Sequence, residues 1–78
     1  MIRILWFAKL KEAMGKDETL WSEVPLRVSG LKQELQERYS DLPSLDGVMV
    51  AVNEQYADEN TELKDGDTIA FIPPVSGG

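Results

Sequence analysis

The chain contains no cysteine and no histidine among its 78 residues. A domain this small often depends on disulfides or a structural metal, so their absence leaves a hydrophobic core as the main means of holding a fold. The same absence excludes Cys/His zinc sites, Cys–His nucleophiles and imidazole acid–base catalysis. With 42% hydrophobic residues, the composition still supports a packed core. We therefore expect one small domain that is not catalytic alone.

The charge balance is acidic, with 14 acidic against 8 basic residues and a net charge of −6. An acidic surface repels phosphate backbones, so nucleic acid is not an expected partner. It favours encounter with a basic protein surface, although the same charge also serves simply to keep a small domain in solution. The apolar start over residues 1–8 is too short to span a membrane and lacks the features of a signal peptide. We expect a cytoplasmic protein with no membrane contact.

Several apolar runs predict β-strands. They are rich in β-branched and aromatic residues and cover residues 2–8, 19–24, 48–53 and 67–72, with a short further segment at 56–57. In the first run, alternation places Ile2, Ile4 and Trp6 on the core face and Phe7 on the opposite face. The run over 48–53 is almost continuously apolar, which favours a central strand covered on both faces.

One helix is predicted over residues 29–39 from the helical spacing of Leu31, Leu35 and Tyr39. Ser29 is the expected cap, and Lys32 is assigned to an outward, solvated face together with Glu34, Glu37 and Arg38. Residues 9–14 predict one or two further helical turns that end at Gly15. This order of elements describes an α+β fold in which one main helix packs across one face of a mixed sheet.

Two acidic segments do not support a metal site or acid–base catalysis. The run over residues 58–62 lacks the glycine that a calcium-binding EF-hand loop requires, because Leu63 stands in its place. Asp65 and Asp67 flank a tight turn at Gly66 and are expected to stabilise that turn. The chain also has no glycine-rich phosphate-binding motif, so neither a metal nor a bound cofactor is expected.

The ending FIPPVSGG is the unusual feature of the sequence. Pro73 and Pro74 have no amide donors and cannot extend a β-ladder, so the last strand ends and the chain continues as a stiff arm that reaches about 20 Å. Gly77 and Gly78 carry no side chains, so this end can enter a narrow channel and present its carboxylate. We divide the chain into a domain over 1–72 and a reactive tail over 73–78. A frayed terminus is the simpler alternative.

These motifs together resemble a known family. The ending, preceded by LKDGDTIA at 63–70 and MVAVN at 49–53, is similar to the small subunit of molybdopterin synthase, a member of the ubiquitin-like β-grasp sulfur carriers. The opening IRILWFAKLKE, followed by Gly15, matches the same family, and the resemblance covers essentially the whole chain. The fold it implies is a mixed sheet of four to five strands with one main helix and a flexible C-terminal tail. One departure is Arg27, where the family often has a threonine cap.

The resemblance implies that the main-chain terminus is the reactive group. In the family, an adenylyltransferase similar to ubiquitin-activating enzymes uses ATP to adenylate the terminal glycine, which is Gly78 here. A sulfur donor protein then supplies the sulfur of a thiocarboxylate. The large catalytic subunit of molybdopterin synthase uses that sulfur to build the dithiolene of molybdopterin, in molybdenum cofactor biosynthesis. Gly77 is then the spacer, and the arm consists of Pro73, Pro74, Val75 and Ser76.

Docking of such a carrier requires an exposed apolar patch. Phe7, on the non-core face of the first strand, and Ile72, opposite Phe71, are the first candidates, and Tyr56 is the third. The implied assembly with the large subunit is a heterotetramer. The alternative to an interface role is that each of these side chains is partly buried within the domain itself.

Two other classes of function remain open. The chain could instead carry sulfur for thiamine synthesis or tRNA thiolation, or act as a ubiquitin-like protein modifier, because these share the activation step and differ in the acceptor. It could also be a non-covalent β-grasp binding module with an inert tail. Deleting Gly77 and Gly78 separates this last class from the sulfur carriers.

Overall fold

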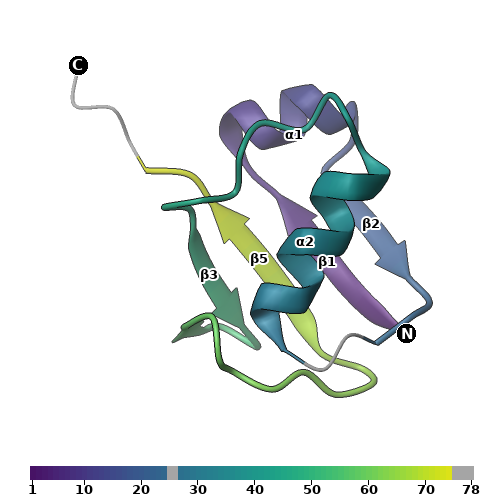
Figure 1. The fold of residues 1–78 in the computed structure, drawn as a ribbon, viewed down its shortest axis with the longest axis vertical. Helices are drawn as coiled ribbons and strands as arrows, with labels where there is room; N and C mark the ends of the chain where they lie inside the picture. The colour runs from purple at the N-terminus through teal and green to yellow at the C-terminus, as the bar shows by residue number, and fades with distance from the viewer. Residues whose placement is uncertain (25–26, 75–78) are drawn as a thin grey trace.

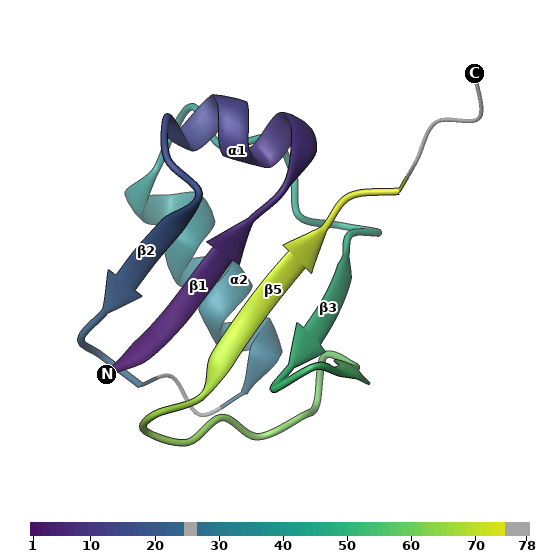
Figure 2. The ribbon, with the colours of Figure 1, turned by 180° about the vertical axis from the view of Figure 1, so that it is seen from behind.

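A five-stranded mixed sheet forms the body of the protein in our computed structural model, which describes residues 1–24 and 27–74. Figure 1 shows one helix crossing one face of the sheet, and Figure 2 shows the opposite face with no helix over it. The elements, in chain order, are β1 (Ile2–Trp6), α1 (Ala8–Met14), β2 (Glu18–Trp21), α2 (Val28–Arg38), β3 (Met49–Val52), β4 (Gln55–Ala57) and β5 (Thr68–Ile72). The crossing helix is α2, while α1 lies at one end of the sheet. The α+β prediction is confirmed.

The strand order is β2-β1-β5-β3-β4, with β1 and β5 parallel and the other neighbours antiparallel. The prediction that residues 48–53 form the central, doubly covered strand is wrong, because β5 is central and β3 lies next to the edge strand β4. Val50 is buried, whereas Met49 is 46% exposed. Alternate residues of β3 face opposite sides of the sheet, so one set packs into the core, and the other set forms part of an apolar surface on the helix-free face.

The core lies between α2 and the sheet, as the alternation in the sequence predicts. Ile2, Ile4 and Trp6 of β1 are each at most 1% exposed. Trp6 stacks on Phe71 of β5 with ring centroids 5.5 Å apart. The indole N–H of Trp6 donates a hydrogen bond of 2.8 Å to the hydroxyl of Thr19 on β2, so the polar atom of this buried ring is satisfied.

The start of α2 differs from the prediction. Arg27, not Ser29, occupies the N-cap position, and its side chain makes no capping bond. Main-chain carbonyls of the 59–61 loop take the place of a cap: the N–H of Val28 donates to the carbonyl of Thr61, and that of Ser29 to the carbonyl of Glu59, each at 3.0 Å. These bonds satisfy two of the donors that every helix leaves free at its N-terminus.

The prediction for Lys32 is also wrong, because the same loop covers it. Helical spacing assigned this residue to the solvated face, but it is only 9% exposed. Its ammonium group donates to the Glu59 carboxylate at 2.6 Å. The loop is distant in sequence and packs over this side of α2, so helical periodicity alone gave no sign of it.

The remaining boundaries agree with the prediction at Gly15 and Gly66, but β1 and β2 are shorter than predicted. Phe7 ends β1 earlier than expected because it is the N-cap residue of α1, and α1 ends at Gly15, whose φ of 70° is the left-handed conformation expected there. β2 ends at Trp21, short of the predicted residue 24. Gly66 adopts a φ of 93° in the turn before β5, as predicted.

Candidate functional site

The helix-free face of the sheet carries a row of side chains that crosses four strands. Register pairs Leu5 of β1 with Ala70 of β5, Ala70 with Ala51 of β3, and Ala51 with Tyr56 of β4. The two alanines are opposite one another in the middle of the row, and a methyl group cannot fill the space that larger neighbours enclose. The sheet surface is therefore hollowed at this point.

The hollow, which we call the sheet hollow, has a volume of about 370 Å³. Larger side chains surround its alanine floor, and the full lining is Leu5, Phe7, Ala51, Glu54, Tyr56, Thr68, Ala70 and Ile72. Phe7 is 44% exposed and Tyr56 is 75% exposed, so two large aromatic rings stand open to solvent at its margin. Aromatic side chains of this kind are enriched in protein–protein interfaces.

The structure brings together the three residues predicted to bind a partner. Phe7, Ile72 and Tyr56 come from separate parts of the chain and all line the sheet hollow. Their role in binding stays a prediction. Sequence reasoning missed the floor, Ala51 and Ala70, because small residues on a strand give no signal until the register places them opposite each other.

The turn between β3 and β4 holds Tyr56 at the hollow. Asn53 has a φ of 51°, in the left-handed region, and its side-chain amide donates to Asp67 at 2.9 Å. The amide oxygen of Asn53 accepts from the N–H of Thr68 at 3.0 Å. This anchor to the start of β5 fixes the tight reversal that returns the chain as β4, with Tyr56 beside the hollow.

The predicted tail begins next to the hollow. β1 and β5 are parallel neighbours, so Phe7, which follows β1, and Pro73, which follows β5, lie at the same end of the sheet. Pro73 is buried and Pro74 is exposed. The other predicted tail residues, Val75, Ser76, Gly77 and Gly78, lie outside the described residues, and their roles stay predictions.

Neither a metal centre nor a membrane span is found in residues 1–24 and 27–74. No group of three or more acidic, histidine or cysteine side chains there is arranged to hold a metal ion. No helix in this part of the chain is long and apolar enough to cross a bilayer. The sheet hollow is open and largely apolar and lies next to the point where the chain leaves the sheet, an arrangement suited to binding a protein surface.

Known proteins resemble this chain in sequence over nearly its whole length. The model of the ThiS family matches residues 4–78. The chain is 40% identical to the molybdopterin synthase sulfur carrier subunit of Dictyostelium discoideum, over 97% of this chain and 94% of the relative. It is 38% identical to the protein of the same name from Escherichia coli, and that alignment covers 100% of both chains.

Solved structures share the fold. A putative molybdopterin converting factor subunit 1 from Pyrococcus furiosus has a TM-score of 0.77 at 30% identity, over 95% of this chain and 97% of that one. A chain from the complex of molybdopterin-converting factor subunits 1 and 2 of Helicobacter pylori scores 0.71 at 29% identity, over 99% of this chain and 97% of that one. The small archaeal modifier protein 1 of Methanosarcina acetivorans scores 0.79 at 26% identity, over 99% and 95%. The structure is therefore a ubiquitin-like β-grasp domain, and the chain belongs to the ThiS family.

Proposed function

We propose that this chain is the sulfur carrier subunit of a molybdopterin synthase and that Gly78 bears the transferred sulfur. The observation that carries the proposal is the similarity, over nearly the whole length, to curated sulfur carrier subunits of that enzyme, at 40% identity for the Dictyostelium protein. The proposal keeps the division into a domain over 1–72 and a tail over 73–78. It places the protein in the cytoplasm, in keeping with a chain that has no cysteine.

The chemistry proceeds in two substitutions at the carboxyl carbon of Gly78. A free carboxylate is a poor acyl donor, so an adenylyltransferase first joins one of its oxygens to the α-phosphate of ATP and releases pyrophosphate. Sulfur at the sulfide oxidation level, delivered by a donor protein, then attacks the acyl carbon, and AMP leaves with the original oxygen. The product is a thiocarboxylate, in which sulfur has replaced one oxygen without oxidation or reduction. The chain itself binds no cofactor, since ATP is used by the activating enzyme.

The large subunit of the synthase is the proposed acceptor. Its surface covers the sheet hollow, with Phe7, Ile72 and Tyr56 at the contact, and the tail from Pro73 onward enters its active site. There the thiocarboxylate sulfur attacks the pterin precursor, and water then cleaves the acyl–sulfur bond, which leaves the sulfur on the precursor and returns Gly78 to a carboxylate. Two carriers in a heterotetramer supply the two sulfurs of the dithiolene. The complex of subunits 1 and 2 from Helicobacter pylori, in which a similar chain is joined to a second subunit, supports such an assembly.

Intact-mass measurement tests the proposal directly. The full chain is incubated with a molybdopterin-type activating enzyme, ATP and a sulfur source, and its mass is expected to rise by the difference between sulfur and oxygen. The variant lacking Gly77 and Gly78 is expected to stay unchanged in mass yet still bind the large subunit. The cognate carrier of the same enzyme serves as the positive control. If that control gains sulfur while this chain does not, the proposal is wrong.

The second candidate is a ubiquitin-like protein modifier, which the similarity to the archaeal modifier protein favours. In that case Gly78 forms isopeptide bonds with lysines of many proteins. Peptide mass spectrometry of cell extracts would detect such linkages, and their absence alongside thiocarboxylate formation favours the sulfur carrier. Carriers for thiamine or tRNA thiolation would gain sulfur as well, but would not restore molybdopterin synthesis with a purified large subunit.

A further inference from the structure

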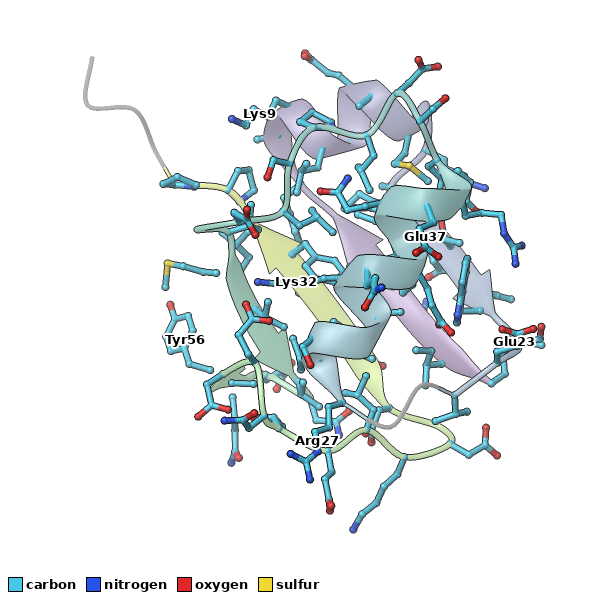
Figure 3. The ribbon with its side chains drawn as sticks, viewed as in Figure 1. Lys9, Glu23, Arg27, Lys32, Glu37 and Tyr56 are labelled. Atoms are coloured by element: carbon cyan, nitrogen blue, oxygen red, sulfur yellow. The ribbon has the colours of Figure 1, made fainter. Side chains whose placement is uncertain are left out.

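A second hollow lies between α2 and β2, away from the sheet hollow. We call it the α2–β2 pocket; it has a volume of about 340 Å³ and is lined by Trp21, Glu23, Glu34, Glu37 and Arg38. Figure 3 shows Glu23 and Glu37 on the β2 side of α2, whereas Tyr56 lies on the other side, beyond β3. A partner bound at the sheet hollow would therefore leave this pocket open.

Two side chains that line the pocket each have a buried polar atom with no hydrogen-bond partner among the described residues. These atoms are the indole nitrogen of Trp21, a side chain only 6% exposed, and one carboxylate oxygen of Glu34. Buried polar groups are nearly always satisfied, and leaving one unpaired is unfavourable. The chain's other indole illustrates the usual state, because Trp6 donates to Thr19. Of the side chains that line this hollow, one thus has a buried donor and another a buried acceptor that are unpaired within residues 1–24 and 27–74.

The charges of the pocket are unbalanced as well. Glu23, Glu34 and Glu37 outnumber Arg38, the single cation in the lining. The guanidinium of Arg38 lies 5.1 Å from the centroid of the Trp21 ring, over its face. None of the ion pairs between described residues involves Arg38, so it does not neutralise these carboxylates by direct pairing.

From these observations we propose that the α2–β2 pocket is a docking site for an arginine side chain on a partner protein. The planar guanidinium offers several donors to the carboxylates of Glu34 and Glu37, in the geometry that carboxylates bind best. A main-chain carbonyl of the same partner segment accepts from the indole N–H of Trp21. When the partner binds, the long, exposed side chain of Arg38 moves off the Trp21 ring, and the incoming guanidinium takes its place there.

This docking needs neither the tail nor the sheet hollow, so it stands apart from the proposed sulfur-carrier function. It gives the acidic chain a second contact with a basic partner while the sheet hollow is occupied. The failure of either proposal leaves the other intact.

The two indole N–H signals of the full-length, ¹⁵N-labelled protein provide the test. The probe is the blocked peptide N-acetyl-Gly-Arg-Gly-amide, and the control peptide carries citrulline, which has nearly the same shape without the charge. We expect saturable movement of the Trp21 signal with the arginine peptide and none with citrulline. The Trp6 signal should stay in place throughout. A Trp21 signal that does not move, or that moves together with Trp6, overturns the proposal.

Variants that change the charge of the pocket are expected to shift the affinity for the arginine peptide in opposite directions. Exchanging Glu34 and Glu37 together for glutamine should weaken peptide binding about tenfold or more, as expected for the loss of a charge-assisted hydrogen bond. Arg38→Gln should strengthen binding, because it removes the competing cation. Glu12→Gln, on the exposed surface of α1, is the matched control and should leave the affinity unchanged. If Glu12→Gln weakens binding as much as the paired change, general charge attraction explains the result and the specific pocket does not.

Discussion

At the scale of single residues, the two tryptophans have the same apolar role but different polar surroundings. Both rings are buried on the core face of the sheet, in β1 and β2, at 1% and 6% exposure. Trp6 has a hydrogen-bond partner in Thr19, while Trp21 has none among the described residues. Sequence reasoning assigned Trp6 to the core, which is confirmed, but a ring's polar partner depends on cross-strand register that composition does not reveal.

The partner of Trp6 can be removed without changing the shape of the core. Thr19→Val replaces the hydroxyl by a methyl group and leaves the Trp6 N–H buried and unsatisfied. We expect the free energy of unfolding in urea to fall by about 1–3 kcal/mol. Hydrogen exchange at the Trp6 indole should also accelerate, whereas Thr19→Ser keeps the hydroxyl and should keep that protection. An unchanged exchange rate in Thr19→Val would contradict the assigned bond.

At the scale of elements, the sequence was sufficient to predict the type and order of nearly every helix and strand. The alternation of Ile2, Ile4 and Trp6 and the helical spacing of Leu31 and Leu35 are local patterns, and all five side chains are buried as expected. What local patterns could not supply was contact between distant segments. The floor of the sheet hollow required the register of β3 on β5, and the buried position of Lys32 required the 59–61 loop.

The N-terminus of α2 depends on such a distant contact, and a capping side chain at position 27 should stabilise it further. Arg27 has the extended backbone of an N-cap residue but its side chain makes no capping bond. Arg27→Thr supplies a hydroxyl that accepts from the first turn, and we expect a gain of about 0.5–1 kcal/mol in the free energy of unfolding. The 59–61 loop already satisfies two donors, so a larger gain is not expected. Arg27→Ala is the control; a similar gain there would mean that removing the charge, rather than adding a cap, is responsible.

At the scale of the whole molecule, the sheet has one face that packs against α2 and stabilises the fold, and another that faces solvent. The face under α2 holds the core, and the other carries the sheet hollow beside the start of the tail. A change on the open face should therefore affect docking far more than folding. This separation makes the proposed contact with the large subunit testable without unfolding the carrier.

A substitution that fills the sheet hollow should best separate the effect on docking from the effect on folding. Ala70→Leu places a larger side chain on the alanine floor, where it meets solvent rather than the core. We expect the free energy of unfolding to change by less than about 1 kcal/mol. Binding to the large subunit, measured by calorimetry, should weaken about tenfold or more, equivalent to about 1.4 kcal/mol. Leu20→Ala is the control, because Leu20 is 61% exposed and does not line the hollow. Equal losses in both variants would exclude the hollow as the specific contact.

The net charge of −6 acts at a different stage of association from the hollow. Long-range attraction to a basic partner accelerates encounter, whereas the desolvated apolar contact determines how long the complex lasts. We therefore expect the association rate with the large subunit to fall steeply as sodium chloride is raised, while the dissociation rate changes little. Ala70→Leu should show the reverse, with faster dissociation and an unchanged salt dependence of association. Stopped-flow fluorescence measures both rates; an association rate that is insensitive to salt would show that the acidic surface does not guide this encounter.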